Sequence, residues 1–261
     1  MGGPMLAAMA KAGLDVVGYD IRPLAEFGSL ARLMRSDPAE FAADIAVLFT
    51  VVRDIKETET LLFGATGLLD LSPNLELLVI CSTLSPRYLD SLRDRVLSQI
   101  ALVDAPMSGA EVAAKEGRLS FMLGGDAKDL ARLEPYLQAM GAFFHKMGAF
   151  GSGMKAKVLN NLLAASSTVM TRQVLDWAVE FDLDPERLLA LINTSSGQNW
   201  FASGFEEIEF AKAGFEAQNT LGILQKDVAS ALDAAPQDAD KRLGLLLAEL
   251  IGGLTPYTSS K

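Results

Sequence analysis

The first 150 residues alternate short apolar runs with amphipathic helical patterns. Strand-like runs occupy residues 14–20, 45–52, 75–82, 100–104, 119–123 and 143–147. Helical patterns lie between most of them, for example in 54–63, 86–96 and 127–140. This alternation is typical of a doubly wound parallel sheet with helices on both faces. The first half of the chain therefore predicts an α/β fold.

The second half has a different pattern, because no convincing strand follows residue 153. Helical patterns cover residues 154–181, 184–193, 200–213, 220–234 and 240–251. We predict one domain over residues 1–150 and an all-helical domain over 151–261. The polar segment 193–200 is expected to be a loop between helices with Trp200 buried.

Composition excludes several function classes. The chain has 261 residues, and no apolar run approaches the roughly 20 residues of a membrane span. Its net charge of −10 argues against nucleic acid as a partner. The single cysteine, Cys81, and the absence of a signal-peptide pattern favour a cytoplasmic protein without an internal disulfide. The single histidine, His145, in an apolar run is expected in the core or at a strand edge, and no metal site is expected.

The N-terminus has the order helix, strand and acid. A helical pattern in residues 5–13 leads into the run 14–20, which ends at Asp20. This is the second half of a βαβ dinucleotide-binding unit, in which the acid accepts from the adenosine ribose. The first strand and the first two glycines of such a unit are not in the sequence. Asp20 favours NAD over NADP because it repels a 2′-phosphate, although Arg22 could bind that phosphate.

Small and hydroxyl residues follow two of the expected strands, where ligands bind in open α/β sheets. Thr83 lies in the hydroxyl-rich segment 81–86, in which Ser85 before Pro86 predicts a helix N-cap. The segment 104–110 reads Asp-Ala-Pro-Met-Ser-Gly-Ala. Its small residues allow backbone N–H groups to approach a carboxylate closely. A plain tight turn remains the alternative for this segment.

The segment 151–161 places a cation and two amides on one helical face. Lys157, Asn160 and Asn161 are three and four residues apart, so they point in similar directions on an α-helix. A lysine beside neutral donors suits general acid/base chemistry. The competing interpretation is a solvated surface lysine. Lys155 lies about 200° round the helix from Lys157 and is not a candidate.

These motifs together resemble the β-hydroxyacid dehydrogenases, which include 3-hydroxyisobutyrate dehydrogenase and belong with 6-phosphogluconate dehydrogenase. The pattern Gly-x-Gly-x-x-x-Lys-x-x-Asn-Asn matches 151–161, and Leu-x-x-x-Lys-Asp corresponds to the segment ending at Asp227. The resemblance implies a Rossmann-like domain followed by a helical substrate and dimerisation domain. It assigns Lys157 as the acid/base and Asn161 as a substrate-holding residue.

The same resemblance assigns the remaining site residues. It implies that Ser108, Gly109 and Ala110 bind the substrate, with Ala110 in place of the family's second glycine. It assigns the cofactor to a set of residues in both halves, namely Gly2 as the third glycine of the phosphate turn, Asp20, Arg22, Thr83 and Lys226.

The resemblance implies an NAD(P)-dependent oxidoreductase, with NAD preferred. Hydride would pass between nicotinamide and a small β-hydroxy acid or its semialdehyde, in a homodimer or homotetramer. Two alternatives stay open. The missing first strand favours a non-catalytic dinucleotide-fold binding module, whereas an imine reductase-like enzyme shares the architecture but generally lacks the lysine found here as Lys157.

Overall fold

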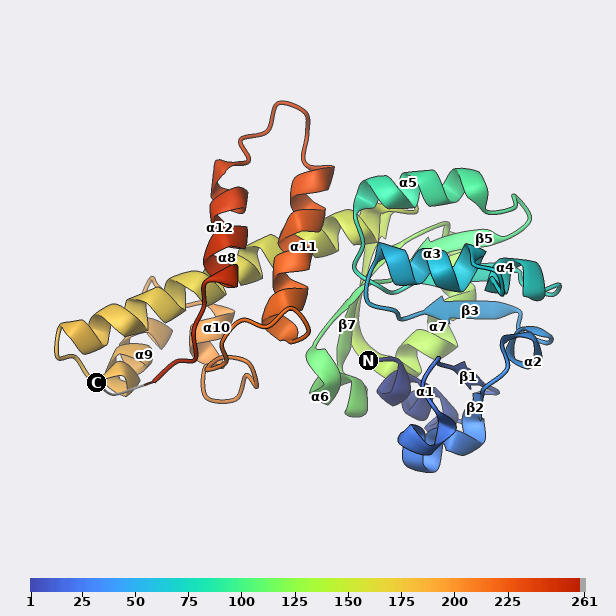
Figure 1. Ribbon diagram of the computed structural model, residues 1–261, viewed down its shortest axis with the longest axis horizontal. Coiled ribbons are helices and arrows are strands. Elements are labelled where there is room, and N and C mark those ends of the chain that lie inside the picture. Colours follow the sequence, from blue (N-terminus) through green and yellow to red (C-terminus); the bar gives the residue numbers. More distant parts are fainter. Residues whose placement is uncertain (259–261) are drawn as a thin grey trace. The chain divides into compact units, whose positions relative to one another are not determined.

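The computed structural model describes residues 1–258 (Figure 1). The chain divides into two compact units, and we call Met1–Lys157 unit 1 and the part from Val158 onward unit 2. The division falls inside the long helix α8, Ser152–Glu180.

Unit 1 contains the strands and the shorter helices. Its strands are β1 Gly18–Tyr19, β2 Met34–Arg35, β3 Val47–Thr50, β4 Leu77–Ile80, β5 Ala101–Asp104, β6 Met107–Ser108, β7 Leu119–Gly124 and β8 Gly141–Gly148. Its helices are α1 Gly2–Lys11, the 3₁₀ segment η1 Leu24–Leu33, α2 Pro38–Ala42, α3 Ile55–Phe63, α4 Leu68–Leu71, α5 Pro86–Arg95, α6 Ala110–Lys115 and α7 Ala127–Met140. The predicted alternation of strand and helix is confirmed.

The main sheet of unit 1 is parallel at one side and mixed at the other. Among the described residues it has six strands, with β3, β4 and β5 parallel and β7 antiparallel to both β5 and β6. The sequence pattern predicted a parallel sheet, and at this edge the sheet is instead mixed. After β6 only residues 109–118 precede β7, fewer than the dozen or so residues that a parallel crossover needs.

Apolar side chains cover both faces of this sheet, as a doubly wound fold requires. On one face α1, α6 and α7 pack on β4, β5 and β7, around core residues such as Met5, Val79 and Leu133. On the other face α2, α3, α4 and α5 pack on β3 and β4, around residues such as Leu62 and Leu89. Figure 1 shows α3 and α5 on the side of the strands opposite α7.

The two N-terminal strands form a separate parallel pair. β1 pairs only with β2 among the described strands, and β3 is the first strand of the main sheet. In the common doubly wound order 3-2-1-4-5-6, one further strand stands between these two sheets. The described residues supply no such strand, in agreement with the sequence expectation.

The described residues of unit 2 form helices joined by turns and loops, without a strand. Besides most of α8, it holds α9 Pro185–Asn193, α10 Trp200–Ser203, α11 Thr220–Ala234 and α12 Arg242–Gly252. α11 and α12 lie side by side (Figure 1) and bury an apolar seam with α8 that includes Val169, Val228 and Leu247. Arg172 on α8 is buried and donates to the carbonyl oxygens of Ala211, Ala213 and Thr255, which joins three segments of this unit.

The sequence expectation is wrong for the segment 200–213. The predicted helix ends at Ser203, and turns follow Gly204, a poor helix former. Trp200 is 44% exposed instead of buried, because Asn199 caps α10 and sets its phase so that the neighbouring Phe201 takes the core position at 0% exposure. His145 lies exposed on the edge strand β8.

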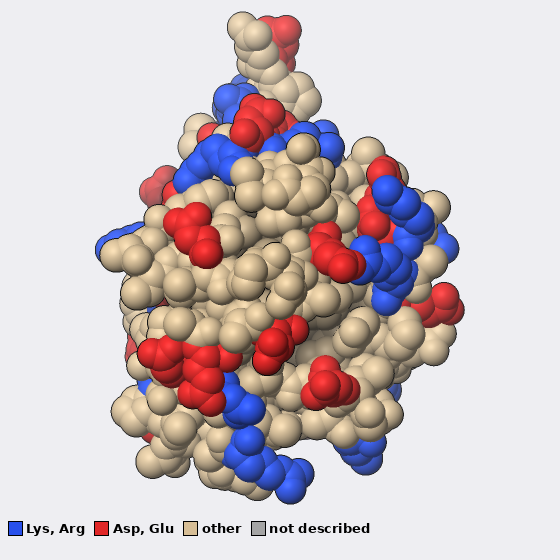
Figure 2. Space-filling view, turned by 90° about the vertical axis from the view of Figure 1, so that its right-hand side faces the viewer, with Lys and Arg blue, Asp and Glu red and all other residues tan. Residues whose placement is uncertain are grey.

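The surface carries both signs of charge. In the face shown in Figure 2, acidic and basic side chains are interspersed among uncharged ones without a continuous basic patch. Within residues 1–258, none of the helices combines the length and the apolar character that crossing a bilayer requires. Cys81, whose thiol is not in a disulfide, is buried at the end of β4.

Candidate active site

The beginning of α8 buries the lysine that the sequence singled out. Lys157 is only 7% exposed, and the next residue, Val158, is 2% exposed. Lys155, on the other side of the helix, is exposed, as expected from its angular position. Lysine is rarely so deeply buried in proteins. The interpretation of Lys157 as a solvated surface lysine is therefore wrong for this structure.

One turn after Lys157, Asn161 is held by a buried acid. Its side-chain Nδ2 donates to Asp227 Oδ2 at 2.5 Å, and its Oδ1 accepts from Asn160 Nδ2 at 3.2 Å. The other oxygen of Asp227, Oδ1, lies 2.6 Å from Lys226 Nζ. The amide of Asn161 thus has a defined orientation. Sequence reasoning quoted Asp227 in a motif but gave it no role.

Asp104, the last residue of β5, is fully buried and bonded to the start of α8. Its Oδ1 accepts from the backbone N–H of Gly151 at 2.6 Å, and its Oδ2 accepts from the backbone N–H of Met154 at 2.5 Å. Burial raises the pKa of this carboxyl to about 6, although the two N–H donors act in the opposite direction. Asp104 is the first residue of the segment 104–110, but the sequence does not show that it is buried or which groups it contacts.

The loop after β4 is fixed at several points. Ser85 Oγ accepts from the backbone N–H of Arg87 at 3.3 Å, which confirms the N-cap predicted before α5. Ser82 Oγ accepts from the backbone N–H of Val52 at 3.0 Å. Thr83, between them, is partly exposed at the carboxyl end of the sheet, where the resemblance expects the nicotinamide.

The segment from Ser108 to Ala110 forms the turn between β6 and α6. Ser108 ends β6 and Ala110 begins α6, with Gly109 between them at a φ of +132°. L side chains rarely adopt this conformation, so the turn depends on glycine at this point. The structure thus places the Ser108 hydroxyl and the following backbone N–H groups together in one tight turn.

Asp20 and Arg22 are bonded to each other directly after β1. Arg22 donates to the Asp20 carboxylate from its backbone N–H at 3.0 Å, from Nε at 3.1 Å and from its terminal nitrogen at 3.0 Å. The Arg22 guanidinium lowers the pKa of Asp20. Asp20 is therefore a carboxylate at neutral pH, as an acceptor of ribose hydroxyls must be.

A dinucleotide fits the donor set of unit 1 at two points. α1 begins at Gly2, and within the described residues no side chain caps its N-terminus, so its first N–H groups can bind a phosphate. The carboxylate of Asp20 lies at the end of the next strand, the position of the ribose acceptor in dinucleotide folds.

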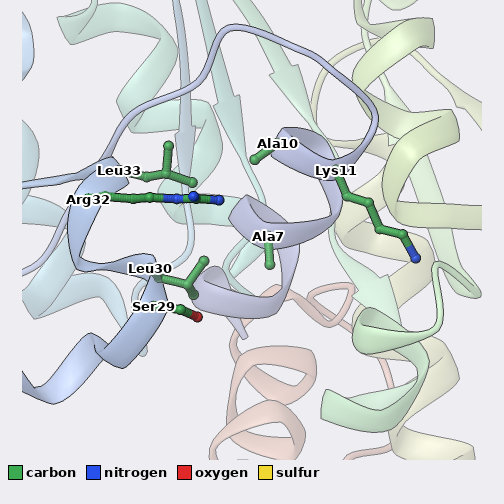
Figure 3. A pocket seen from close by; sticks show the side chains of 7 residues that line it. All are labelled: Ala7, Ala10, Lys11, Ser29, Leu30, Arg32 and Leu33. Carbon is green, nitrogen blue, oxygen red and sulfur yellow. The ribbon is translucent and has the colours of Figure 1, made fainter.

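A pocket of about 350 Å³ lies elsewhere in unit 1, between α1 and η1. Figure 3 shows Arg32 and Leu33 of η1 directed towards α1, with the ammonium of Lys11 turned away. None of the site residues predicted from the sequence lines this pocket.

Comparison with known proteins decides the family. The model of the NAD binding domain of 6-phosphogluconate dehydrogenase matches residues 1–151. The model described as NAD-binding of NADP-dependent 3-hydroxyisobutyrate dehydrogenase matches residues 151–250. The chain belongs to the β-hydroxyacid dehydrogenase family. It is accordingly an NAD(P)-dependent enzyme of that family, and the alternative of a non-catalytic module is set aside.

Individual relatives agree with this assignment. 3-Hydroxyisobutyrate dehydrogenase of Pseudomonas aeruginosa is 32% identical over 260 residues, covering 96% of this chain and 87% of that protein. L-Threonate dehydrogenase of Cupriavidus necator is 28% identical over 240 residues, covering 90% and 80%. The structure of 3-hydroxyisobutyrate dehydrogenase of Mycobacterium tuberculosis with L-serine has a TM-score of 0.79 and 25% identity, covering 98% of this chain and 92% of that one.

Proposed function

We propose that this enzyme interconverts a small β-hydroxy acid and its carbonyl form, with Lys157 as the general acid/base. When bound, the nicotinamide cofactor supplies or accepts the hydride at the carbinol carbon. Lys157 would take the proton of the hydroxyl during oxidation and return it to the carbonyl oxygen during reduction. The burial of Lys157, at 7% exposure on the helical face that leads to Asn161, is the observation that carries this proposal.

The substrate would be held at its polar ends by residues that the structure presets. The Asn161 amide is oriented by Asp227, so it is available to hold the reacting substrate without reorganisation. The turn at Ser108, Gly109 and Ala110 would bind the carboxylate through the Ser108 hydroxyl and backbone N–H groups. Relatives named for 3-hydroxyisobutyrate and L-threonate support a short hydroxy acid as the substrate class.

We propose NAD as the preferred cofactor, held by Gly2, Asp20, Arg22, Thr83 and Lys226. Asp20 would accept from a ribose 2′-hydroxyl and would repel a 2′-phosphate. Arg22 is bonded to Asp20 through three N–H groups, so its guanidinium is engaged before any phosphate arrives. Fluorescence titration with NADH and NADPH checks this preference, and tighter binding of NADPH would contradict it.

The decisive test of the proposed chemistry is Lys157→Ala beside the matched control Lys155→Ala. We expect Lys157→Ala to lower kcat by about 10²- to 10⁴-fold, the usual contribution of a positioned acid/base, while the Kd for NADH stays unchanged. Lys155→Ala removes an exposed lysine of the same helix and should leave kcat unchanged. Hydroxyisobutyrate, glycerate and threonate form the substrate panel. Wild-type turnover in Lys157→Ala would refute the acid/base role.

We also propose that the enzyme is a homodimer or homotetramer joined through unit 2. An apolar stripe along α8 supports this, because four large side chains of the helix, with Phe181 directly after its end, are 52–71% exposed: Leu159, Leu163, Met170 and Trp177. Such a stripe is unusual on a monomer surface. Light scattering on Leu163→Glu should show a smaller particle than the wild-type protein.

A further inference from the structure

The first turn of α8 is joined to the strand ends of unit 1 by three hydrogen bonds that no assigned role explains. The carboxylate of Asp104 accepts from the N–H groups of Gly151 and Met154 at 2.6 and 2.5 Å. The Met154 sulfur accepts from the backbone N–H of Leu84 at 3.3 Å. Leu84 follows Thr83 directly. The start of α8 is thus attached both to the end of β5 and to the loop after β4.

The bonds of Asp104 are specific in geometry. A helix begins with N–H groups that have no partner within the helix, and a carboxylate is the strongest acceptor for them. The acid comes from a strand 47 residues before Gly151 in the sequence, so it joins two elements instead of capping a helix locally. Gly124 on β7 makes room for it, because a Cβ at that position would overlap Asp104 Oδ1.

The anchored turn lies directly before the proposed acid/base. Met154 and Lys157 are three residues apart on α8, so they are neighbours on the helix surface. Met154 itself is fully buried, and Lys157 is 7% exposed. Rotation or translation of the first turn would therefore displace the ammonium group of Lys157. Displacements of about 1 Å at a reacting group can cost about 10²-fold in rate.

We propose that Asp104 is a positioning residue for the reaction, which fixes the first turn of α8 on the ends of β4 and β5 and so sets where Lys157 presents its ammonium group. This inference rests on the proposed role of Lys157. As a positioning residue, Asp104 is not proposed to contact the substrate or the cofactor. It acts only through the helix that it holds.

The charge of Asp104 makes this anchor sensitive to pH. Protonation turns one carboxyl oxygen into a hydroxyl and removes the negative charge, which makes that oxygen a much weaker acceptor for its N–H group, so the anchor is weakened. Burial raises the pKa of Asp104 to about 6. Of the ionisable groups that face this carboxylate, the ammonium of Lys155 on α8 favours its charged form, while the charge of Asp104 itself raises the pKa of the buried thiol of Cys81 after β4. kcat should accordingly fall on the acid side with an apparent pKa of about 6.

The experiment compares the pH dependence of kcat in the wild-type enzyme, Asp104→Asn and Asp129→Asn. Asp129 is a matched buried acid, 5% exposed in the first turn of α7. In Asp104→Asn we expect kcat to fall about 10-fold or more at pH 7.5, the acid limb to vanish and the Kd for NADH to stay within about 2-fold. Asp129→Asn should keep the wild-type profile.

A double-mutant cycle separates positioning from a general loss of structure. If Asp104 acts through Lys157, adding Asp104→Asn to Lys157→Ala should change the residual kcat by less than about 2-fold. An equal loss in both backgrounds would overturn the proposal, as would a wild-type profile without an acid limb between pH 5 and 7, whether or not Asp104→Asn folds. Full activity of Lys157→Ala would instead refute the proposed acid/base, so the two failures are distinguishable.

Discussion

The two units each bury a carboxylate, but they hold it in different ways. In unit 1 both oxygens of Asp104 accept from backbone N–H groups, those of Gly151 and Met154. In unit 2 the oxygens of Asp227 contact side chains, the amide of Asn161 and the ammonium of Lys226. Backbone donors belong to an element of the fold, whereas side-chain donors can rotate. The first carboxylate therefore fixes a helix, and the second orients functional groups.

The two arrangements also differ in charge. Backbone N–H groups offer only partial positive charges, and for Asp104 they do not offset the loss of hydration, so its pKa is raised to about 6. Asp227 instead has a whole positive charge at 2.6 Å. The acid of unit 1 should thus respond to pH, and loss of a partner is the informative change for the acid of unit 2.

The largest loss of stability is expected when Asp227, whose carboxylate contacts the side chains of Asn161 and Lys226, is removed. Asp227→Ala removes both the acceptor of the Asn161 amide and the carboxylate of the ion pair with Lys226. Removing one member of a buried pair typically costs 3–5 kcal/mol, and since the Lys226 side chain is 26% exposed we expect about 3 kcal/mol of unfolding free energy. Urea denaturation measures it, and kcat/KM should fall because Asn161 loses its orientation.

Asp227→Asn is the matched variant for this prediction. It retains an oxygen that can accept from Asn161 but removes the negative charge beside Lys226. We expect it to lose less unfolding free energy than Asp227→Ala and to keep more of kcat/KM. Equal stability of the wild-type protein and Asp227→Ala would show that side-chain partners do not matter for this acid.

Most of the fold follows from periodic patterns in the sequence. The helices α7 and α11 have the bounds that their patterns predicted, 127–140 and 220–234, because their apolar residues recur with the helical period. The antiparallel position of β7 did not follow, since it depends on the length of a connection and not on any pattern within the strand. The exposed Trp200 was missed for a similar reason, because the cap at Asn199 decides which aromatic residue faces the core.

Local motifs single out candidate site residues, but they do not reveal contacts made in the tertiary structure. The glycines before Lys157 and the pair of asparagines after it are local signals that singled out this lysine; the structure buries it, and its role stays a prediction. Asp104 and Asp227 lay within quoted motifs, but an isolated acid in a sequence does not reveal its partners. Gly151 lies 47 residues after Asp104 along the chain, and Asn161 lies 66 residues before Asp227.

A smaller effect is expected from pH on the acid of unit 1. The pKa of Asp104 is about 6 in the folded protein, whereas an aspartate carboxyl ordinarily has a pKa of 3.8, so the folded state binds more protons between these values. The stability that this group contributes is present below about pH 4 and is lost as the pH rises through about 6. Relative to Asp104→Asn, which cannot titrate, the wild-type protein should lose about 2 kcal/mol of unfolding free energy between pH 4 and pH 7.

Unfolding free energies of both proteins over this pH range provide the measurement. Asp129→Asn again serves as the control, because it removes another buried acid of unit 1. If the difference in unfolding free energy between the wild-type protein and Asp104→Asn stayed constant over this pH range, the hydrogen bonds from the backbone N–H groups would fully offset the lost hydration of the buried carboxylate. The contrast between the two acids would then disappear.

The smallest effect is expected from replacing Lys226, the lysine that contacts Asp227 in unit 2. Lys226→Met removes a charge proposed to contact the cofactor, but Asp227 lies 2.6 Å from that charge and neutralises much of it. We therefore expect the Kd for NADH to rise only about 2- to 5-fold, within the range of partly exposed ion pairs. Lys212→Met is the control, since Lys212 is an exposed lysine of the same unit paired with Glu206 at 2.6 Å, and its loss should leave the Kd unchanged. If both variants bind NADH like the wild-type protein, Lys226 is not a cofactor residue and serves only as the partner of Asp227.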